Sequence, residues 1–181
     1  MNQFYFPLDW EEGLEANMLQ KRKHRNKVYI CSPLSGENAE EILSNIRNAR
    51  AYMYYIGVKM NAVARAPHAY LPFLLCDDIP AERSLALQFG LRLLEESDAL
   101  FVCGNRISGG MKGEIQRAAE LKMPITVFDR DTYIEARRLA TQCGADKKLV
   151  AFSECHDTLA ASSPVSEKER TVTKCYANFL V

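Results

Sequence analysis

Five short apolar runs recur along the middle of the chain, and longer amphipathic stretches separate them. The runs are 27–31 (KVYIC), 58–67 (VKMNAVARAP), 98–104 (DALFVCG), 123–129 (MPITVFD) and 148–152 (KLVAF). Runs of this length with turn residues at their ends are typical of β-strands. The run at 98–104 is almost continuously apolar, which favours a strand with helices on both of its faces.

The stretches between these runs have helical periodicity. In residues 37–57, Ile42, Ile46 and Met53 fall on one helical face, which predicts an amphipathic helix ending at Gly57. Further helices are predicted at 81–97, where Leu85, Phe89 and Leu93 share a face, at 109–122, and at 131–144, closed by Gly144. Strands that alternate with helices predict a parallel sheet with right-handed crossovers.

The pattern divides the chain into three parts. Residues 27–152 are predicted to form one α/β domain, a three-layer sandwich around a parallel sheet of about five strands. Residues 1–26 are an N-terminal extension rich in aromatic residues, and residues 153–181 are a Ser/Thr-rich C-terminal tail. If the strand order is 2-1-3-4-5, strands 1 and 3 are neighbours, and the loops that follow them face each other across one crevice.

Charge and hydropathy exclude several classes of protein. The 181 residues carry 23 basic and 23 acidic side chains, so the chain has no broad basic surface for nucleic acid or an anionic membrane. The basic cluster at 21–27 (KRKHRNK) is short and is typical of a solvated linker. The sequence has neither the features of a signal peptide nor an apolar run long enough for a membrane span, so we expect a cytoplasmic protein.

The six cysteines lack the spacing of a metal site or a disulfide framework. No CxxC pair is present, and the Cys155-His156 dipeptide has no second pair at a zinc-site spacing. We expect reduced, mostly buried thiols, with no metal and no cofactor.

Two glycine-containing loops at the predicted crevice could hold a phosphate or a sugar. The first follows strand 1 and offers the hydroxyls of Ser32 and Ser35 beside Gly36. The second follows strand 3 and runs through Ser108, Gly109 and Gly110 into a helix, whose first N–H groups favour anions. Neither is a Walker loop or a GxGxxG fingerprint, and plain turns between strand and helix explain them equally well.

Glu114 is the candidate catalytic carboxylate. An acid near a helix N-terminus is often there only for its interaction with the helix dipole. However, Met111, Ile115 and Ala118 mark the buried stripe of this helix, and Glu114 lies at its edge, facing the crevice. A carboxylate there could attack an anomeric carbon or stabilise an oxocarbenium ion.

The connection after strand 2 supplies further candidates. His68 could hold a ligand hydroxyl or donate a proton, although a lone histidine is more often a packing residue. Asp77 and Asp78 could assist catalysis or cap the next helix, and Arg83 could pair with them or bind a phosphate. The remaining candidates for substrate contacts are Tyr29, Pro33, Asn105 and Met111.

The segments VYICSPLSG and SDALFVCGNRISGGMKGEIQRAAELKMPI resemble the nucleoside 2-deoxyribosyltransferase-like superfamily, which includes the deoxynucleoside 5′-monophosphate N-glycosidases. The resemblance covers about residues 27–128. It implies a flavodoxin-like sheet, a homo-oligomer in which a neighbouring subunit completes the site, and a double displacement in which Glu114 attacks C1′. The loops SPLSG and ISGG match the parts that hold the sugar or its 5′-phosphate.

The sequence departs from this family at one position. The resemblance implies an aspartate on the helix before strand 3, where this chain has Gly90 between Phe89 and Leu91. None of these side chains can transfer a proton. We therefore expect either an N-glycosidic enzyme acting on a nucleoside, nucleotide or related ribosyl compound, with His68, Asp77 or Asp78 replacing the aspartate, or a nucleotide-binding or sensing module without turnover.

Overall fold

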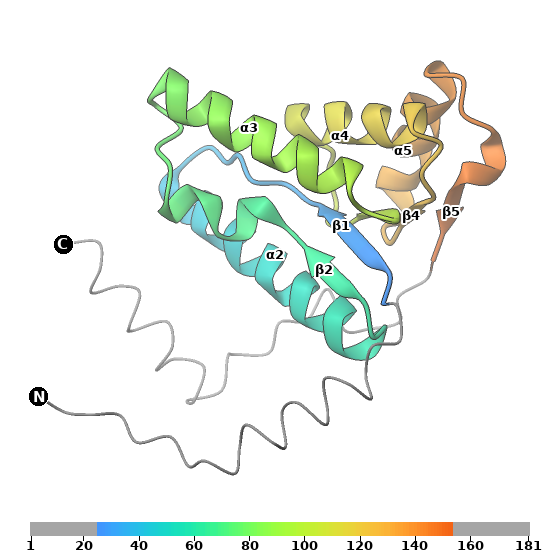
Figure 1. Cartoon of the computed structure of the whole chain (residues 1–181), viewed down its shortest axis with the longest axis horizontal. Coiled ribbons are helices and arrows are strands. Elements are labelled where there is room, and N and C mark those ends of the chain that lie inside the picture. Colours follow the sequence, from blue (N-terminus) through green and yellow to red (C-terminus); the bar gives the residue numbers. More distant parts are fainter. Residues whose placement is uncertain (1–24, 154–181) are drawn as a thin grey trace, which may run out of the picture.

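The computed structural model describes residues 25–153, which form an α/β domain around one parallel sheet (Figure 1). The strands are β1 (Lys27–Cys31), β2 (Val63–Arg65), β3 (Ala99–Val102), β4 (Ile125–Val127) and β5 (Val150–Phe152). The helices are α2 (Ala39–Lys59), α3 (Pro80–Glu95), α4 (Gly109–Glu120) and α5 (Arg130–Gln142). Three 3-10 turns complete the domain, η1 (Pro67–Ala69), η2 (Leu71–Phe73) and η3 (Lys147–Leu149).

The strand order is β2-β1-β3-β4-β5, which confirms the predicted topology of a flavodoxin-like fold. Every pair of neighbouring strands is parallel, and Cys31 of β1 pairs with Val102 of β3. The carboxyl ends of β1 and β3 therefore meet at the centre of the sheet. This is where ligands bind in open α/β sheets.

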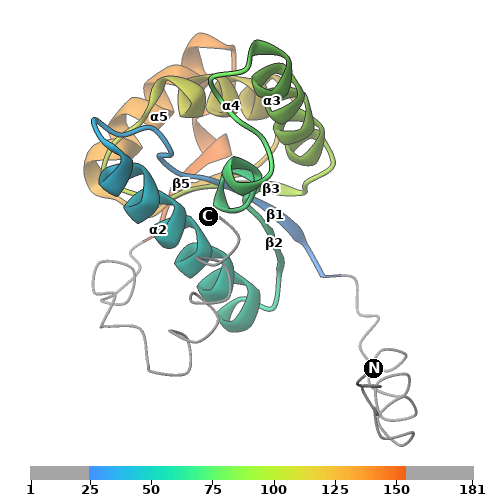
Figure 2. The same ribbon diagram turned by 90° about the vertical axis from the view of Figure 1, so that its left-hand side faces the viewer.

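Figure 2 shows the sheet between two helical layers, α2 on one side and α3, α4 and α5 on the other. Successive residues of β1 alternate between these layers. Tyr29 and Cys31 pack under α3 and α4, whereas Val28 and Ile30 pack against α2 and η1. Burial on both faces explains why the strands are nearly continuous apolar runs.

The prediction that the first helix ends at Gly57 was wrong. Helix α2 continues to Lys59, and the N–H of Met60 donates to the carbonyl of Ile56 at 3.2 Å. The chain reverses at Asn61, whose φ of 49° lies in the left-handed region. Asparagine tolerates this conformation better than most residues, so Asn61 serves in place of the glycine that normally follows a helix.

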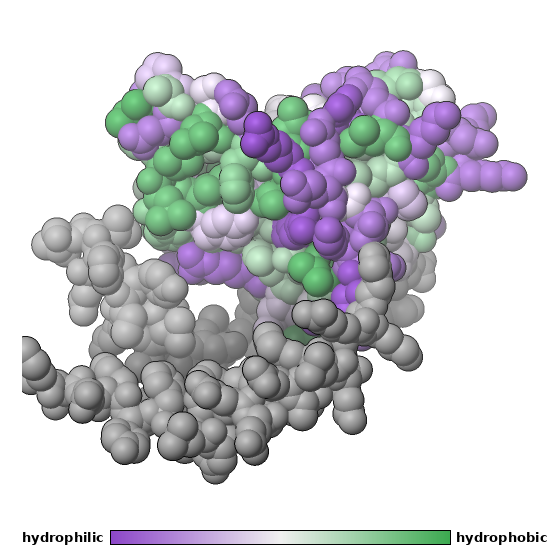
Figure 3. Space-filling view, in the orientation of Figure 1, coloured by the Kyte–Doolittle hydropathy of each residue, from purple (hydrophilic) through white to green (hydrophobic). Residues whose placement is uncertain are grey.

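The periodicity of α3 did not reveal which of its faces is buried. Gly90 and Leu94 are buried, while Leu85 and Phe89 are 55% and 43% exposed. Gly90 allows the helix to approach the sheet, because a Cβ atom there would lie only 3.4 Å from the hydroxyl oxygen of Tyr29. Figure 3 shows apolar side chains gathered over the part of the domain that contains α3 and the turns before it.

The two predicted glycine loops lie side by side, as expected. Gly104 has a φ of 95°, and a Cβ atom on it would come within 3.0 Å of the Pro33 ring. The side chain of Arg106 reaches from the second loop to the carbonyl of Ser35 in the first. Predictions for residues 1–24 and 154–181, including the aromatic extension and most of the tail, lie outside the described residues.

The fold predicts that replacing two isoleucines by alanine lowers the free energy of unfolding by very different amounts. Ile115 of α4 is fully buried in the core, whereas Ile134 of α5 is 70% exposed. Ile115→Ala should lower the free energy of unfolding by about 2–5 kcal/mol, because it leaves a cavity. Ile134→Ala should change it by less than about 0.5 kcal/mol. Urea denaturation measures both, and equal costs would contradict the packing described here.

Candidate functional site

Glu114 projects from the second turn of α4 towards the centre of the sheet. The helix begins after Ser108, whose hydroxyl accepts the N–H of Met111 at 3.5 Å. Met111 and Ile115 are buried against the core, while Glu114 beside them is half-buried. The predicted edge position of Glu114 is therefore the observed one.

A short hydrogen bond fixes the Glu114 carboxylate. The hydroxyl of Tyr29 in β1 donates to Oε1 of Glu114 at 2.7 Å. The thiol of Cys31, on the same face of β1, donates to the carbonyl of Met111 in α4 at 3.9 Å. The buried Tyr29 hydroxyl thus holds the carboxylate between α4 and the sheet.

Burial and hydrogen bonding act in opposite directions on Glu114. Burial raises the pKa of its carboxyl above the ordinary value, and the neighbouring Tyr29 hydroxyl and Cys31 thiol partly offset this increase. Burial and the neighbouring carboxylate also raise the pKa of Tyr29. Tyr29 therefore remains a protonated donor at neutral pH, and the ionised form of Glu114 is disfavoured by burial and favoured by this donor.

His68 forms the second polar contact at the carboxyl end of β1. Its Nε2 shares a hydrogen bond of 2.7 Å with the hydroxyl of Ser32, the first residue after the strand. Burial lowers the pKa of His68 to about 4, so its imidazole is neutral at pH 7. A neutral imidazole can position a hydroxyl group, but it has no extra proton to donate near neutral pH.

Gly90 lies at the junction of the two polar contacts. A Cβ atom on Gly90 would come within 3.4 Å of the Tyr29 hydroxyl oxygen and 3.6 Å of the ring of Pro67, the residue before His68. This is the position where the family resemblance implies an aspartate. A side chain here would point at the hydroxyl that holds Glu114.

The acids expected to substitute for that aspartate lie elsewhere. Asp77 and Asp78 are exposed in the turn before α3, and the only ion pair of this turn joins Arg83 to Asp77 at 3.4 Å. Within residues 25–153, no hydrogen bond or ion pair connects either aspartate to Glu114 or His68. Sequence analysis grouped these acids with His68 because all three residues lie in the segment between β2 and α3. The two aspartates come about ten residues after His68, however, which is far enough for the chain to carry them away from it.

The other candidate residues fall into a buried group and an exposed group. Tyr29, Pro33 and Met111 are buried and support the site from beneath. Ser35, Asn105, Gly109 and Gly110 are exposed along the two loops. Cβ atoms added to Gly109 or Gly110 would meet nothing within 4 Å, so open space surrounds the start of α4.

Sequence reasoning missed three residues of this region: Cys31, Glu41 and Arg106. Cys31 could have been found, because it lies two residues after Tyr29 and so faces the same side of β1. Arg106 Nη2 forms an ion pair with Glu41 at 3.1 Å, and these residues are 65 positions apart. No local pattern in the sequence indicates such a contact between loops.

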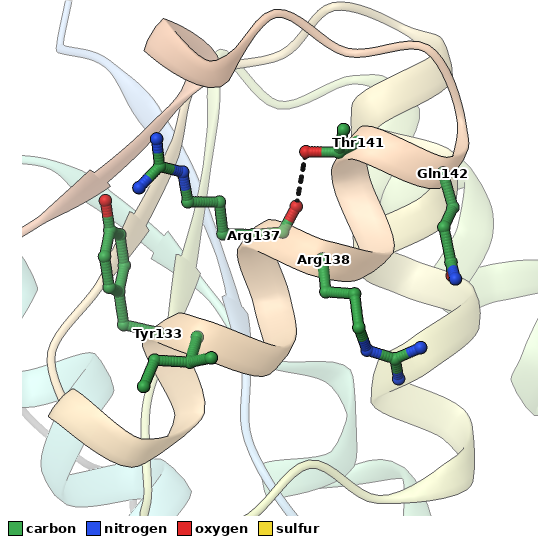
Figure 4. Close-up of a pocket in the computed structure, with 6 residues that line it drawn as sticks. Tyr133, Arg137, Arg138, Thr141 and Gln142 are labelled. Carbon is green, nitrogen blue, oxygen red and sulfur yellow. Dashed lines mark hydrogen bonds between the residues drawn. The ribbon is translucent and has the colours of Figure 1, made fainter.

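A shallow hollow elsewhere on the domain does not include these residues. It runs along the outer surface of α5 and is lined by Tyr133, Ile134, Arg137, Arg138, Thr141 and Gln142 (Figure 4). The hydroxyl of Thr141 donates to the carbonyl of Arg137 at 2.8 Å, so part of the lining is satisfied within the helix. The described cysteines are buried (Cys31, Cys103), half-buried (Cys143) or exposed (Cys76), and no disulfide joins them.

Comparison with known families places the chain in one whose function has not been assigned. Residues 26–128 match the family described as "Domain of unknown function (DUF7768)", and because this match covers more than half of the sequence, the chain belongs to that family. No curated protein matches the chain. Within residues 25–153, no helix combines the length and apolar character that a membrane crossing requires, and no three acidic, histidine or cysteine side chains group as a metal site would.

The environment of His68 predicts an unusual titration. Its NMR ring signals should titrate with a midpoint near 4 instead of 6.5, and His68→Gln identifies them among the three histidines of the chain. Between these pH values the unfolded chain binds a proton at residue 68 and the folded chain does not. Stability should therefore fall as pH decreases from 6.5 towards 4, and His68→Gln should reduce this loss. A midpoint near 6.5 would show that His68 is solvated.

Proposed function

We propose that this protein cleaves or transfers an N-glycosidic bond of a nucleoside, nucleotide or related ribosyl compound, with Glu114 as the nucleophile. The observation that carries this proposal is the Glu114 carboxylate, which accepts a hydrogen bond of 2.7 Å from Tyr29 of β1, the strand whose carboxyl end meets that of β3. Support also comes from the family resemblance, which implies a nucleophilic glutamate at this position.

In the proposed reaction, a Glu114 oxygen forms a bond to C1′ as the bond from C1′ to the base nitrogen breaks. The bonding electrons leave with the base, which gains a proton from water or from its surroundings. Water, or a second base, then attacks C1′ and releases Glu114 as a carboxylate. The neutral His68 and Ser32 would bind a hydroxyl of the sugar.

Tyr29 has a positioning role in this proposal. Its hydroxyl stabilises the ionised form of Glu114, which burial disfavours. It also leaves the carboxylate with few orientations, so attack on C1′ needs little reorganisation. The same hydrogen bond weakens Glu114 as a nucleophile, and the balance between these effects sets the rate.

A binding or sensing role without turnover is the second candidate function. The observation that favours it is Gly90, which places no acid beside the Tyr29 hydroxyl where the family resemblance implies one. Such a module would use the same loops and the open space beside Gly109 and Gly110 to hold a nucleotide.

Substitution of Glu114 tests the proposal. The protein is incubated with a panel of nucleosides, deoxynucleoside monophosphates and NAD-like dinucleotides, and the released base is measured by chromatography. Glu114→Gln should lower kcat/KM by about a thousandfold, because an amide cannot attack C1′. Glu120→Gln is the matched control, since Glu120 is exposed on the same helix and pairs with Arg117.

The outcomes separate the two candidate functions. Base release that persists in Glu114→Gln contradicts the catalytic role. Thermal stabilisation by a nucleotide without base release from any compound on the panel supports the binding module instead.

We further propose that the protein is a homo-oligomer that assembles through α3. Twelve large apolar residues of the described chain are exposed, and half of them lie in α3 or in the turns just before it: Leu74, Ile79, Leu85, Leu87, Phe89 and Leu91. A monomer rarely exposes apolar side chains at this density. Because a Cβ atom on Gly90 of the same helix would lie 3.4 Å from the Tyr29 hydroxyl, a second subunit on α3 would lie close to the candidate site.

Charge introduced on this surface should dissociate the assembly. We expect sedimentation velocity to show an oligomer for the wild type and a monomer for the double variant Leu87→Glu, Leu91→Glu, because burying carboxylates in an apolar interface is costly. Gln142→Glu, which adds one charge to the exposed surface of α5, should leave the assembly intact. A monomeric wild type at tens of micromolar would refute this proposal.

A further inference from the structure

The loop after β1 contains an internal carboxylate at the place where a ligand phosphate would be expected. Oε2 of Glu41, from the first turn of α2, accepts the backbone N–H of Glu37 at 2.7 Å. A Cβ atom on Gly36 would come within 2.7 Å of the Glu41 side chain. The absence of a side chain on Gly36 therefore leaves room for the side chain of Glu41, and not for a ligand, to lie against the loop backbone.

Arg106 completes the surroundings of this carboxylate. Its guanidinium lies 3.1 Å from Oε1 of Glu41 and also donates to the carbonyl of Ser35. A backbone N–H and a guanidinium converging on one group of oxygens are the donors that proteins use to bind phosphate. In this structure the Glu41 carboxylate has both of them.

The loop itself is held rigidly around Glu41. The side-chain amide of Asn45 donates to the carbonyls of Leu34 and Ser35 at 3.2 and 3.1 Å. Asn38 caps α2 by accepting the N–H of Glu41 at 2.9 Å. Asn38 already satisfies the helix N-terminus, so helix capping alone does not explain the contact between Glu41 and the second loop.

The local charge disfavours a second anion. The loops and adjoining helical turns at 32–42 and 103–112 contain three acids, Glu37, Glu40 and Glu41, against Arg106 and Lys112. Lys112 points to α5, where its ammonium lies 3.4 Å from Glu135. A phosphate in the first loop would meet a fixed negative charge and would have to compete with Glu41 for Arg106.

We propose that Glu41 occupies the anion position of the loop after β1 and makes the site select an uncharged sugar hydroxyl over a 5′-phosphate. The substrate class named in this inference rests on the proposed function. The claim that Glu41 fills the anion position depends only on the contacts of the loop. The group of the ligand that lies against Ser35 and Gly36 is therefore neutral, and Arg106 acts through Glu41 as a positioning residue.

A stability measurement tests the occupied anion position without any substrate. The melting temperature is measured against increasing inorganic phosphate, with potassium chloride at matched ionic strength as reference. Glu41→Ala should melt lower than the wild type, and phosphate should restore several degrees by binding the vacated Glu37 N–H and Arg106. The wild type and Glu40→Ala, which loses an exposed charge one residue away, should show no phosphate-specific shift.

Either of two results would overturn the inference. Phosphate that stabilises the wild type as much as Glu41→Ala would show that an anion binds while Glu41 is in place. A Glu41→Ala protein with no phosphate-specific response would show that the Glu37 N–H and Arg106 do not form an anion position.

A kinetic comparison tests the selectivity and keeps it distinct from the proposed function. The ratio of kcat/KM for a 2′-deoxynucleoside to that for its 5′-monophosphate should exceed one in the wild type. Glu41→Gln should shift this ratio towards the monophosphate by about tenfold, and Glu40→Gln should not. A wild type that prefers the monophosphate refutes the inference and leaves the proposed function standing. If no base is released from either compound, the proposed function fails, and the phosphate titration still decides the inference.

Discussion

The hydrogen bond between Tyr29 and Glu114 joins strand β1 to α4, the helix that follows the neighbouring strand β3. A carboxylate held this far from water is stable only if donors compensate for the lost hydration. Tyr29 supplies such a donor, and Cys31 on the same face of β1 bonds to the carbonyl of Met111 in the same helix as Glu114. The pairing of β1 with β3 brings α4 over that face, so the site depends directly on the strand order.

Gly90 is the second constraint, and it acts on the same hydroxyl. A Cβ atom on residue 90 would be in van der Waals contact with Tyr29 and Pro67, at 3.4 and 3.6 Å. A side chain longer than alanine would press on these two residues. The glycine thus leaves no polar group of α3 beside the Tyr29 hydroxyl.

The sequence predicted the topology because apolar runs and glycine turns are local signals. It failed where local signals compete. Gly57 is a plausible helix end, yet α2 continues to Lys59. The chain reverses at Asn61, two residues before the edge strand β2 begins. On α3, Leu85 and Phe89 form an apolar stripe as regular as a buried one, but Gly90 and Leu94 face the core.

The site was predictable to a similar extent. The glycine turn before Glu114 placed this carboxylate correctly at the edge of the buried stripe. The sequence did not show which way Tyr29 points, because alternation along a strand does not reveal which helical layer covers each face of the sheet. The pairing of Arg106 with Glu41 was beyond prediction, because it depends on how two loops 65 residues apart pass each other.

The charges around the carboxyl end of β1 complement one another. Glu114 accepts a hydrogen bond from the buried Tyr29, His68 is a neutral imidazole hydrogen-bonded to Ser32, and Glu41 pairs with Arg106. Under the proposed function, a ligand in this region would meet the Ser32–His68 pair and the side chains of Glu114 and Glu41. This distribution suits a sugar that develops positive charge at C1′, because a carboxylate stabilises an oxocarbenium ion more than the neutral sugar it comes from.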